Sequence, residues 1–184
     1  MKKNLYYKAG EEGNVDFAER WNDLEKIIDP HEDHVVLDIG CAEGLISIEL
    51  AKIFKKVFAF DIEPYRIRKA KENAAGFDNI EFTTGSYMSY EYQRYDQVFC
   101  LGVYHKIKSN ERQKALTDMF KKCASTLYLR VPIIGKYVPK TVGVSDVEVL
   151  EIAGNNDFVL ATPHRTETTT RNHIQVRKAL NNTV

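Results

Sequence analysis

The sequence is poor in cysteine, tryptophan and proline, and it has no long apolar run. Its 184 residues include three cysteines, one tryptophan and five prolines. The cysteines, Cys41, Cys100 and Cys123, have neither C-x-x-C spacing nor an even number, so we expect reduced, buried thiols and no disulfide framework. No stretch is long enough to span a membrane, and the first residues contain no signal-like apolar segment. We therefore expect a cytoplasmic protein that does not bind membranes.

An excess of charge of one sign is also missing. The 26 basic and 26 acidic side chains give a formal net charge of zero. Binding of duplex or structured RNA usually needs a strong basic footprint, so this balance favours a small-molecule partner, although a local patch stays open. One basic stretch, at Arg66, Arg68, Lys69 and Lys71, alternates with apolar residues and is expected to be the solvated face of a helix.

The length and the composition predict one domain. With 184 residues, of which 43% are hydrophobic, the chain can build a sizeable core. We expect a single domain over 1–184, with an N-terminal segment and entry helix at 1–30, a cofactor-binding core at 34–131, and a substrate-side connection with the last strands at 132–184.

The most informative segment is a sharp turn from a strand to a helix. Residues 35–39 form an apolar run interrupted by one acid, and Gly40, Ala42 and Gly44 then alternate with other residues. Such a turn lets a ligand lie against bare backbone. A second apolar run ends at Asp61, about 20 residues after Gly40, which is the spacing at which a βαβ unit presents a carboxylate to ribose hydroxyls. This spacing predicts a cofactor that contains adenosine.

The loop does not match the dinucleotide fingerprint G-x-G-x-x-G. Counted from Gly40, the second and third glycine positions hold Ala42 and Leu45. Asp38 and Glu43 also place two carboxylates beside the helix N-terminus, where a pyrophosphate would be repelled. S-adenosylmethionine has no phosphate, and its sulfonium and ammonium groups are attracted by such acids. We therefore expect S-adenosylmethionine, with a dinucleotide-dependent oxidoreductase as the alternative.

The segment Val36–Gly44 resembles the cofactor loop of class I S-adenosylmethionine-dependent methyltransferases, whose pattern is acid-x-Gly-x-Gly-x-Gly. Ala42 replaces the middle glycine, and an alanine is expected to avoid a positive φ at that position. Residues 57–61 resemble the second strand of the family and its ribose-binding acid. Residues 79–86 resemble the third strand, and residues 95–105 resemble the fourth strand and the loop that borders the methyl-acceptor pocket.

The resemblance also implies a set of cofactor contacts. Ser86 stands where the family often has an acid that binds the adenine amino group, which implies a weaker or water-mediated contact with adenine. The implied cofactor-binding residues are Asp38, Gly40, Cys41, Ala42, Glu43, Gly44, Asp61, Ile62, Gly85, Ser86 and Leu101.

Helix and strand patterns alternate along most of the chain. Helices are expected from about Val15 to Ile28, from Leu45 to Phe54, from Pro64 to Ala75, from a cap at Ser109 to Cys123, and after a capping box at Ser145 to Glu148. Strands are expected from Val35, Val57, Ile80, Tyr95, Thr126, Phe158 and His173. This order predicts a doubly wound α/β fold: a mostly parallel seven-stranded sheet with helices on both faces and an antiparallel hairpin at one edge.

Methyl transfer by in-line displacement needs an acceptor atom close to the methyl carbon. It needs a base only where the acceptor has a proton at the working pH. His105 is the best candidate base, because the reference pKa of imidazole is about 6.5 and this residue follows the fourth strand at the carboxyl edge of the sheet. A structural role is the alternative for His105. Tyr104 is a second catalytic candidate, as an aromatic residue lining the same pocket, with packing as its alternative role.

No metal site is expected. His31 and His34 are three residues apart, but they lie in a polar turn with two acids between them. The sequence also shows no cluster of acids that would hold magnesium beside an acceptor.

The methyl acceptor is the least determined part of the function. The loop after the fourth strand, Cys100 to Val103, lacks the Asn-Pro-Pro-Tyr and Pro-Cys patterns of families that methylate exocyclic amines or cytosine C5. A small molecule methylated at O or N is the leading acceptor, and RNA is the alternative. A non-catalytic S-adenosylmethionine-binding protein is the alternative from another class. The N-terminal residues, Gly102–Lys108 and Pro132–Gly143 are expected to enclose the acceptor, and the oligomeric state is left open.

Overall fold

The computed structural model describes residues 17–86, 94–132, 144–164 and 171–178. By its internal contacts the chain divides into two compact units, Met1–Ser89 and Tyr90–Val184. Within the described residues, seven strands form one mixed sheet, to which the first unit contributes three strands and the second unit four. The single-domain boundaries expected from the sequence stay a prediction.

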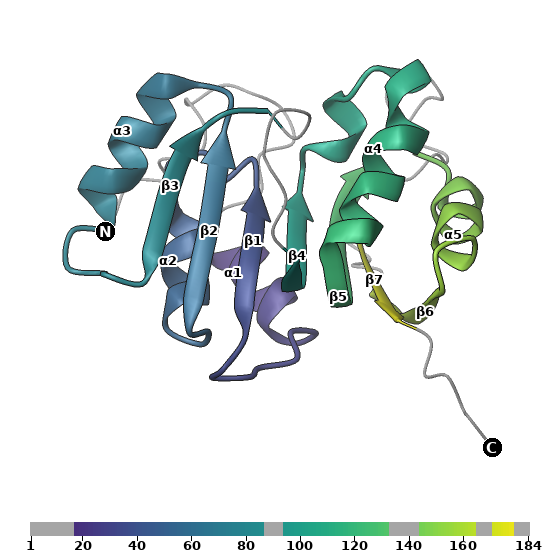
Figure 1. Cartoon of the computed structure of the whole chain (residues 1–184), viewed down its shortest axis with the longest axis horizontal. Coiled ribbons are helices and arrows are strands. Elements are labelled where there is room, and N and C mark those ends of the chain that lie inside the picture. The colour runs from purple at the N-terminus through teal and green to yellow at the C-terminus, as the bar shows by residue number, and fades with distance from the viewer. Residues whose placement is uncertain (1–16, 87–93, 133–143, 165–170, 179–184) are drawn as a thin grey trace. The chain divides into compact units, whose positions relative to one another are not determined.

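The first unit alternates helices and parallel strands (Figure 1). Strand β2 pairs in parallel with both β1 and β3, so the carboxyl ends of all three strands lie at one edge. The apolar side chains of β1 and β2 are buried on both sides, which explains why these strands have continuous apolar runs. The elements are α1 (Phe17–Glu25), β1 (Val35–Ile39), α2 (Leu45–Ala51), β2 (Lys56–Asp61), α3 (Pro64–Asn73) and β3 (Ile80–Thr84).

Local sequence signals define the ends of α2 and α3. Helix α3 begins with Pro64 at its first position, where the missing N–H is not needed. Helix α2 begins after Gly44 and ends at Ala51, three residues before the expected end at Phe54. The amide of Asn79 donates hydrogen bonds to the carbonyls of Ala51 and Phe54, at 2.8 and 3.2 Å, and so satisfies the backbone groups that the helix end leaves exposed.

In the second unit, a parallel pair of strands is followed by an antiparallel pair. Strand β4 pairs in parallel with β5, while β7 pairs antiparallel with β5 on one side and with β6 on the other. The last strand of the chain therefore lies between β5 and β6, and the antiparallel hairpin expected from the sequence is confirmed. The elements are β4 (Tyr95–Leu101), a 3-10 turn η1 (Tyr104–Lys106), α4 (Ser109–Lys122), β5 (Cys123–Pro132), α5 (Asp146–Gly154), β6 (Phe158–His164) and β7 (Arg171–Lys178).

The predicted fold class is confirmed: a mostly parallel α/β sheet of seven strands with an antiparallel pair. One cap prediction was right and one was wrong. The Ser145 hydroxyl accepts from the backbone N–H of Glu148 at 3.5 Å at the start of α5. Ser109, in contrast, is already inside α4, whose N-cap is Lys108 with no side-chain cap bond. In the part of the chain that the structure describes, no helix combines the length and apolar character needed to cross a membrane.

Candidate cofactor site

The loop after β1 is attached to the end of β2 by consecutive backbone N–H groups. The carbonyl of Phe60 accepts from the N–H of Gly40 at 2.8 Å and from that of Cys41 at 2.9 Å. The next N–H, of Ala42, donates to the Oδ2 atom of Asp61 at 2.9 Å. The loop is therefore folded back onto the strand that ends in the predicted ribose acid.

These hydrogen bonds decide what the loop can bind. In dinucleotide sites the N–H groups of a glycine-rich turn point at the pyrophosphate. Here the N–H groups of Gly40, Cys41 and Ala42 are already bound to β2, and that of Gly44 donates to the carbonyl of Cys41 at 2.9 Å. This turn leaves few backbone donors for a phosphate and fits a cofactor without one.

Ala42 adopts the left-handed conformation that its side chain was expected to avoid. Its φ is 51°, so the expectation from the sequence was wrong. The reason is the hydrogen bond to Asp61, which needs this N–H to point toward β2. A non-glycine residue in this region costs about 1–2 kcal/mol, and the surrounding bonds must offset that cost.

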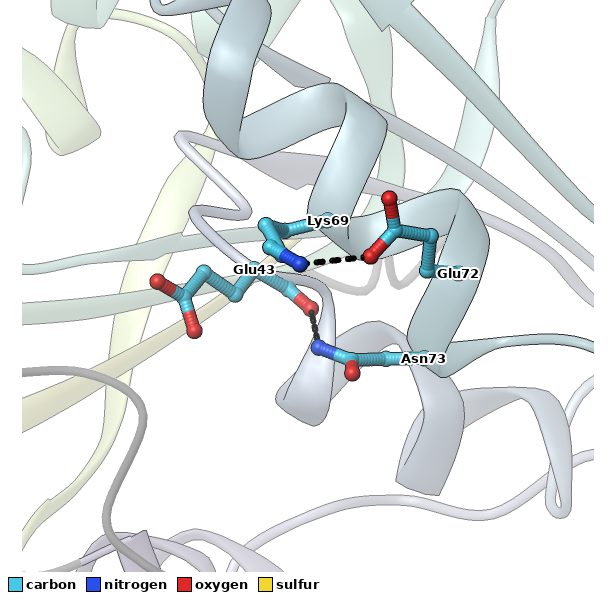
Figure 2. Close-up of polar contacts among 4 residues, drawn as sticks. All are labelled: Glu43, Lys69, Glu72 and Asn73. Carbon is cyan, nitrogen blue, oxygen red and sulfur yellow. Dashed lines mark hydrogen bonds and ion pairs between the residues drawn. The ribbon is translucent and has the colours of Figure 1, made fainter.

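Gly44 allows the loop to pack directly against α3 and β3. Its φ is 78°, and a Cβ added there would lie 2.9 Å from the Cβ of Ala70 and 2.9 Å from the ring of Phe82. Beside it, the amide Nδ2 of Asn73 donates to the carbonyl of Glu43 at 2.9 Å (Figure 2). The glycine and the α3 side chain together fix the loop where α2 begins.

Asp38 is a buried acid that titrates near neutral pH. Its side chain is 2% exposed, and its Oδ2 atom accepts from the hydroxyl of Ser47 at 2.6 Å. Burial raises the pKa of Asp38 to about 7; the Ser47 hydrogen bond opposes this shift, and the charge of Asp61 adds to it. A cationic ligand nearby would favour the ionised form.

Asp61 connects three segments of the first unit. Besides the N–H of Ala42, its carboxylate accepts from the N–H of Glu63 at 3.0 Å, and its backbone carbonyl accepts from the N–H of Gly85 at 3.0 Å. Each carboxylate oxygen has a second lone pair, so both can still accept from ribose hydroxyls.

Cys41 is not a candidate nucleophile. Its thiol is buried, and the pKa of this thiol is raised far above its ordinary value by burial and, to a lesser degree, by the carboxylates of Asp38 and Asp61. It therefore stays protonated and contributes to the loop as a small packed side chain.

The structure brings together all but one of the cofactor-binding residues predicted from the sequence. Asp38, residues 40–44, Asp61, Ile62, Gly85 and Ser86 lie at or just beyond the carboxyl ends of β1, β2 and β3. Ile62 is 65% exposed, which leaves an apolar surface beside Asp61. Leu101 belongs to the second unit, at the end of β4.

The two catalytic candidates lie on η1 in the second unit. Tyr104 is fully buried, and its hydroxyl donates to Oε1 of Glu148 at 3.3 Å. Burial, reinforced by Glu148, raises the pKa of Tyr104 well above its ordinary value, so this residue stays protonated and links η1 to α5. The partly buried His105 is held by its backbone, because Arg112 donates to the carbonyls of His105 and Ile107 at 2.7 and 2.9 Å.

Sequence reasoning missed three residues that support these segments: Ser47, Asn73 and Arg112. Ser47 had a usable signal, because the apolar Leu50 and Ala51, three and four residues further on, place it on the buried face of α2. Asn73 binds a carbonyl 30 residues earlier in the chain, and Arg112 binds carbonyls seven and five residues earlier, and no spacing rule connects either side chain to its partner.

The histidine pair that resembles metal ligands forms a stacked contact. The rings of His31 and His34 lie 4.3 Å apart, and Nε2 of His31 is 3.5 Å from a carboxylate oxygen of Asp29. Among the described residues, no group of three metal-ligating side chains comes together. The absence of a metal stays a prediction.

Comparisons with known proteins agree with this geometry. Residues 36–125 match a family model described as a methyltransferase domain. A magnesium protoporphyrin IX methyltransferase from Synechocystis PCC 6803, solved with bound S-adenosylhomocysteine, aligns with a TM-score of 0.72 at 18% identity over 92% of this chain and 90% of that chain. A 1,6-didemethyltoxoflavin N1-methyltransferase from Burkholderia thailandensis aligns with a TM-score of 0.66 at 16% identity over 80% of this chain and 72% of that one.

Curated relatives match over shorter stretches. An uncharacterised RNA methyltransferase of Oceanobacillus iheyensis is 38% identical over 85 residues, which is 45% of this chain and 15% of that protein. The chain spans at most 30% of the length of the first curated relatives that it matches.

By its fold the chain is similar to Rossmann-like, S-adenosylmethionine-dependent methyltransferases. Residues 36–125 belong to the methyltransferase domain family. The residues present fit its cofactor, because a turn of small residues lies beside Asp61, and Oε2 of Glu43 is buried without a hydrogen-bond donor among the described residues.

Replacing Gly44 by alanine tests the close packing of the loop. Gly44→Ala adds both left-handed strain and a steric overlap with Ala70 and Phe82, so we expect the free energy of unfolding to fall by about 3 kcal/mol. Gly76→Ala is the matched control, because its φ is 101° but nothing lies within 4 Å of an added Cβ. Urea unfolding should show a loss at Gly44 that exceeds the loss at Gly76 by about 1 kcal/mol or more. Equal losses would mean that the overlap is relieved without cost.

The pH dependence of cofactor binding tests the state of Asp38. Because the pKa of Asp38 is about 7 in the free protein, binding a cationic ligand below that pH must release a proton from it. We expect the Kd for S-adenosylmethionine to rise by up to about fivefold from pH 7 to pH 6 and to level off above pH 8. In calorimetry, the Kd of Asp38→Asn should not change with pH over this range. A Kd that does not change with pH in the unaltered protein would contradict the assignment.

The raised pKa of Asp38 also affects stability: the free energy of unfolding of the free protein should fall as the pH rises from about 4 to 7.

Proposed function

We propose that this chain transfers a methyl group from S-adenosylmethionine to an O or N atom of a small molecule by in-line displacement. The observation that carries the proposal is the loop at residues 40–44. Its N–H groups are bound to the end of β2, and carboxylates of Asp38, Glu43 and Asp61 belong to the same region. A site with few free N–H donors and several acids favours a cationic nucleoside over a phosphate.

When bound, S-adenosylmethionine supplies a methyl carbon activated by its sulfonium. The residues of the chain then have three tasks. Asp61 accepts hydrogen bonds from the ribose, Asp38 provides negative charge, and the small residues of the loop allow close approach. Positioning of the acceptor provides most of the rate, since displacement at a methyl group needs alignment more than acid–base chemistry.

His105 is the proposed general base for acceptors that have a proton at the working pH. The two hydrogen bonds from Arg112 hold its backbone in place, which suits a residue that must meet a substrate atom. Tyr104 is the weaker catalytic candidate, because its hydroxyl is buried and donates to Glu148. We assign Tyr104 the task of holding η1.

A small molecule is the proposed acceptor class. The formal net charge of zero supports this class. Two structurally similar proteins are also named as methyltransferases of small molecules, a magnesium protoporphyrin and 1,6-didemethyltoxoflavin. The likeness to an RNA methyltransferase keeps RNA as the second candidate. Of the segments expected to enclose the acceptor, Gly102–Lys108 is described, whereas residues 1–16 and 133–143 lie outside the described residues.

A cytoplasmic location is part of the same proposal. All three cysteines are buried thiols, as is usual for proteins of reducing compartments.

A labelling experiment tests the proposal and the acceptor class together. The protein is incubated with methyl-labelled S-adenosylmethionine and cell extract, and label is counted in small-molecule, RNA and protein fractions. We expect label in the small-molecule fraction, and His105→Ala should lower it by about 10²-fold or more while S-adenosylhomocysteine still binds.

Four outcomes would count against the proposal. Label in RNA would mean that the acceptor is RNA and not a small molecule. Unchanged transfer by His105→Ala would mean that His105 is not the general base. Thermal stabilisation by NADH, with none by S-adenosylhomocysteine, would contradict the cofactor itself. Tight cofactor binding without label in any fraction would favour a non-catalytic binding protein.

A further inference from the structure

One carboxylate oxygen of Glu43 is buried without a hydrogen-bond donor among the described residues. The side chain is partly buried, and its Oε2 atom is buried and accepts no hydrogen bond from any residue that the structure describes. The two other acids of the region have donors: the hydroxyl of Ser47 for Asp38, and backbone N–H groups for Asp61. A buried acceptor without a donor costs free energy, so a donor at Glu43 would stabilise the site.

The backbone of Glu43 is fixed from two sides. Asn73 donates to its carbonyl from α3, and Gly44 packs directly against Ala70 and Phe82. Figure 2 shows the carboxylate of Glu43 pointing away from Asn73, on the other side of the loop backbone. The acceptor oxygen is therefore held on a rigid turn.

The charge of Glu43 contributes to the raised pKa of two basic residues of α3. The hydrogen bond and the charge of Glu72, at 2.6 Å, raise the pKa of Lys69, and Glu43 adds a smaller contribution (Figure 2). For Arg66, burial lowers the pKa, but interactions with Tyr65 and with the carboxylates of Asp61 and Glu43 together raise it above its ordinary value.

Glu43 directly follows Ala42, whose N–H donates to Oδ2 of Asp61 at 2.9 Å, so the two acids belong to adjoining parts of the turn. What the buried Oε2 atom of Glu43 lacks among the described residues is a hydrogen-bond donor. A hydroxyl is such a donor.

We propose that Glu43 is a second acceptor for the ribose hydroxyls of the cofactor, beside Asp61, and that Asn73 positions it. The inference rests on the proposed function. Both carboxylate oxygens of Asp61 already accept a backbone N–H, whereas a ribose diol offers two donors at adjacent carbons. Two carboxylates can each take one of them.

The test is calorimetry with ligands that differ in the ribose. Glu43→Ala should weaken binding of S-adenosylhomocysteine about tenfold, which corresponds to about 1.4 kcal/mol. Glu43→Gln keeps an acceptor oxygen of the same shape and should lose less. Adenosine, 2′-deoxyadenosine and 3′-deoxyadenosine are then measured by displacement of S-adenosylhomocysteine. Glu43→Ala should reduce the preference for adenosine over one of the deoxy forms at least fivefold.

The controls separate this effect from folding. Glu49→Ala removes a carboxylate of α2 that pairs with the exposed Lys52 at 2.6 Å, and it should leave all four affinities unchanged. Asn73→Ala should reduce the ribose preference in the same direction as Glu43→Ala, a change that mere loss of stability does not produce.

Three results would overturn the inference. The first is unchanged binding of S-adenosylhomocysteine by Glu43→Ala. The second is an equal loss for adenosine and both deoxy forms. The third is a loss for S-adenosylhomocysteine but not for adenosine, which would assign Glu43 to the amino-acid end of the cofactor. Failure of the proposed function is a different result, because the unaltered protein would then not bind S-adenosylhomocysteine at all.

Discussion

The hydrogen bonds from Gly40, Cys41 and Ala42 to the end of β2 are the constraint on which the site depends. They bend the chain at the end of β1 and set the direction in which α2 begins. They also bring Asp61 against the turn, so the carboxylate that holds the loop is also the one proposed to bind the ribose. Few backbone donors then remain for a phosphate. The same bonds therefore explain the local fold and the choice of cofactor.

Electrostatics in this region follows from burial more than from the number of acids. Asp38 is almost fully buried, and burial raises its pKa to near neutral even though Ser47 donates to it. Glu43 is less buried and lies near two cations of α3. The region thus combines a buried acid whose pKa is near neutral with a buried carboxylate oxygen that lacks a donor among the described residues. The proposed S-adenosyl cofactor would supply both a cation and hydroxyl donors.

Much of the fold could be predicted because its signals are local. The apolar run at 35–39, Pro64 at the start of α3 and the Ser145 cap each act within a few residues. The pairing of β7 between β5 and β6 is not local and has no counterpart in periodicity. It depends on which antiparallel partner buries more of each strand, which the sequence alone does not show.

The site could be predicted in part for the same reason. The alternation of small residues and the acid at Asp61 are visible in the sequence, and the structure places them at one sheet edge. The positive φ of Ala42 was not predictable, because it results from a bond to a residue 19 positions away. Asn73 is a similar case, since its partner carbonyl is 30 positions away.

The central claim is that the loop N–H groups belong to β2 and not to the ligand. Amide hydrogen exchange measured residue by residue, with and without S-adenosylhomocysteine, tests it directly. The account predicts that the amides of Gly40, Cys41 and Ala42 are already protected in the free protein and gain little on binding. Fast exchange of these amides in the free protein, with protection only when the ligand is present, would contradict it.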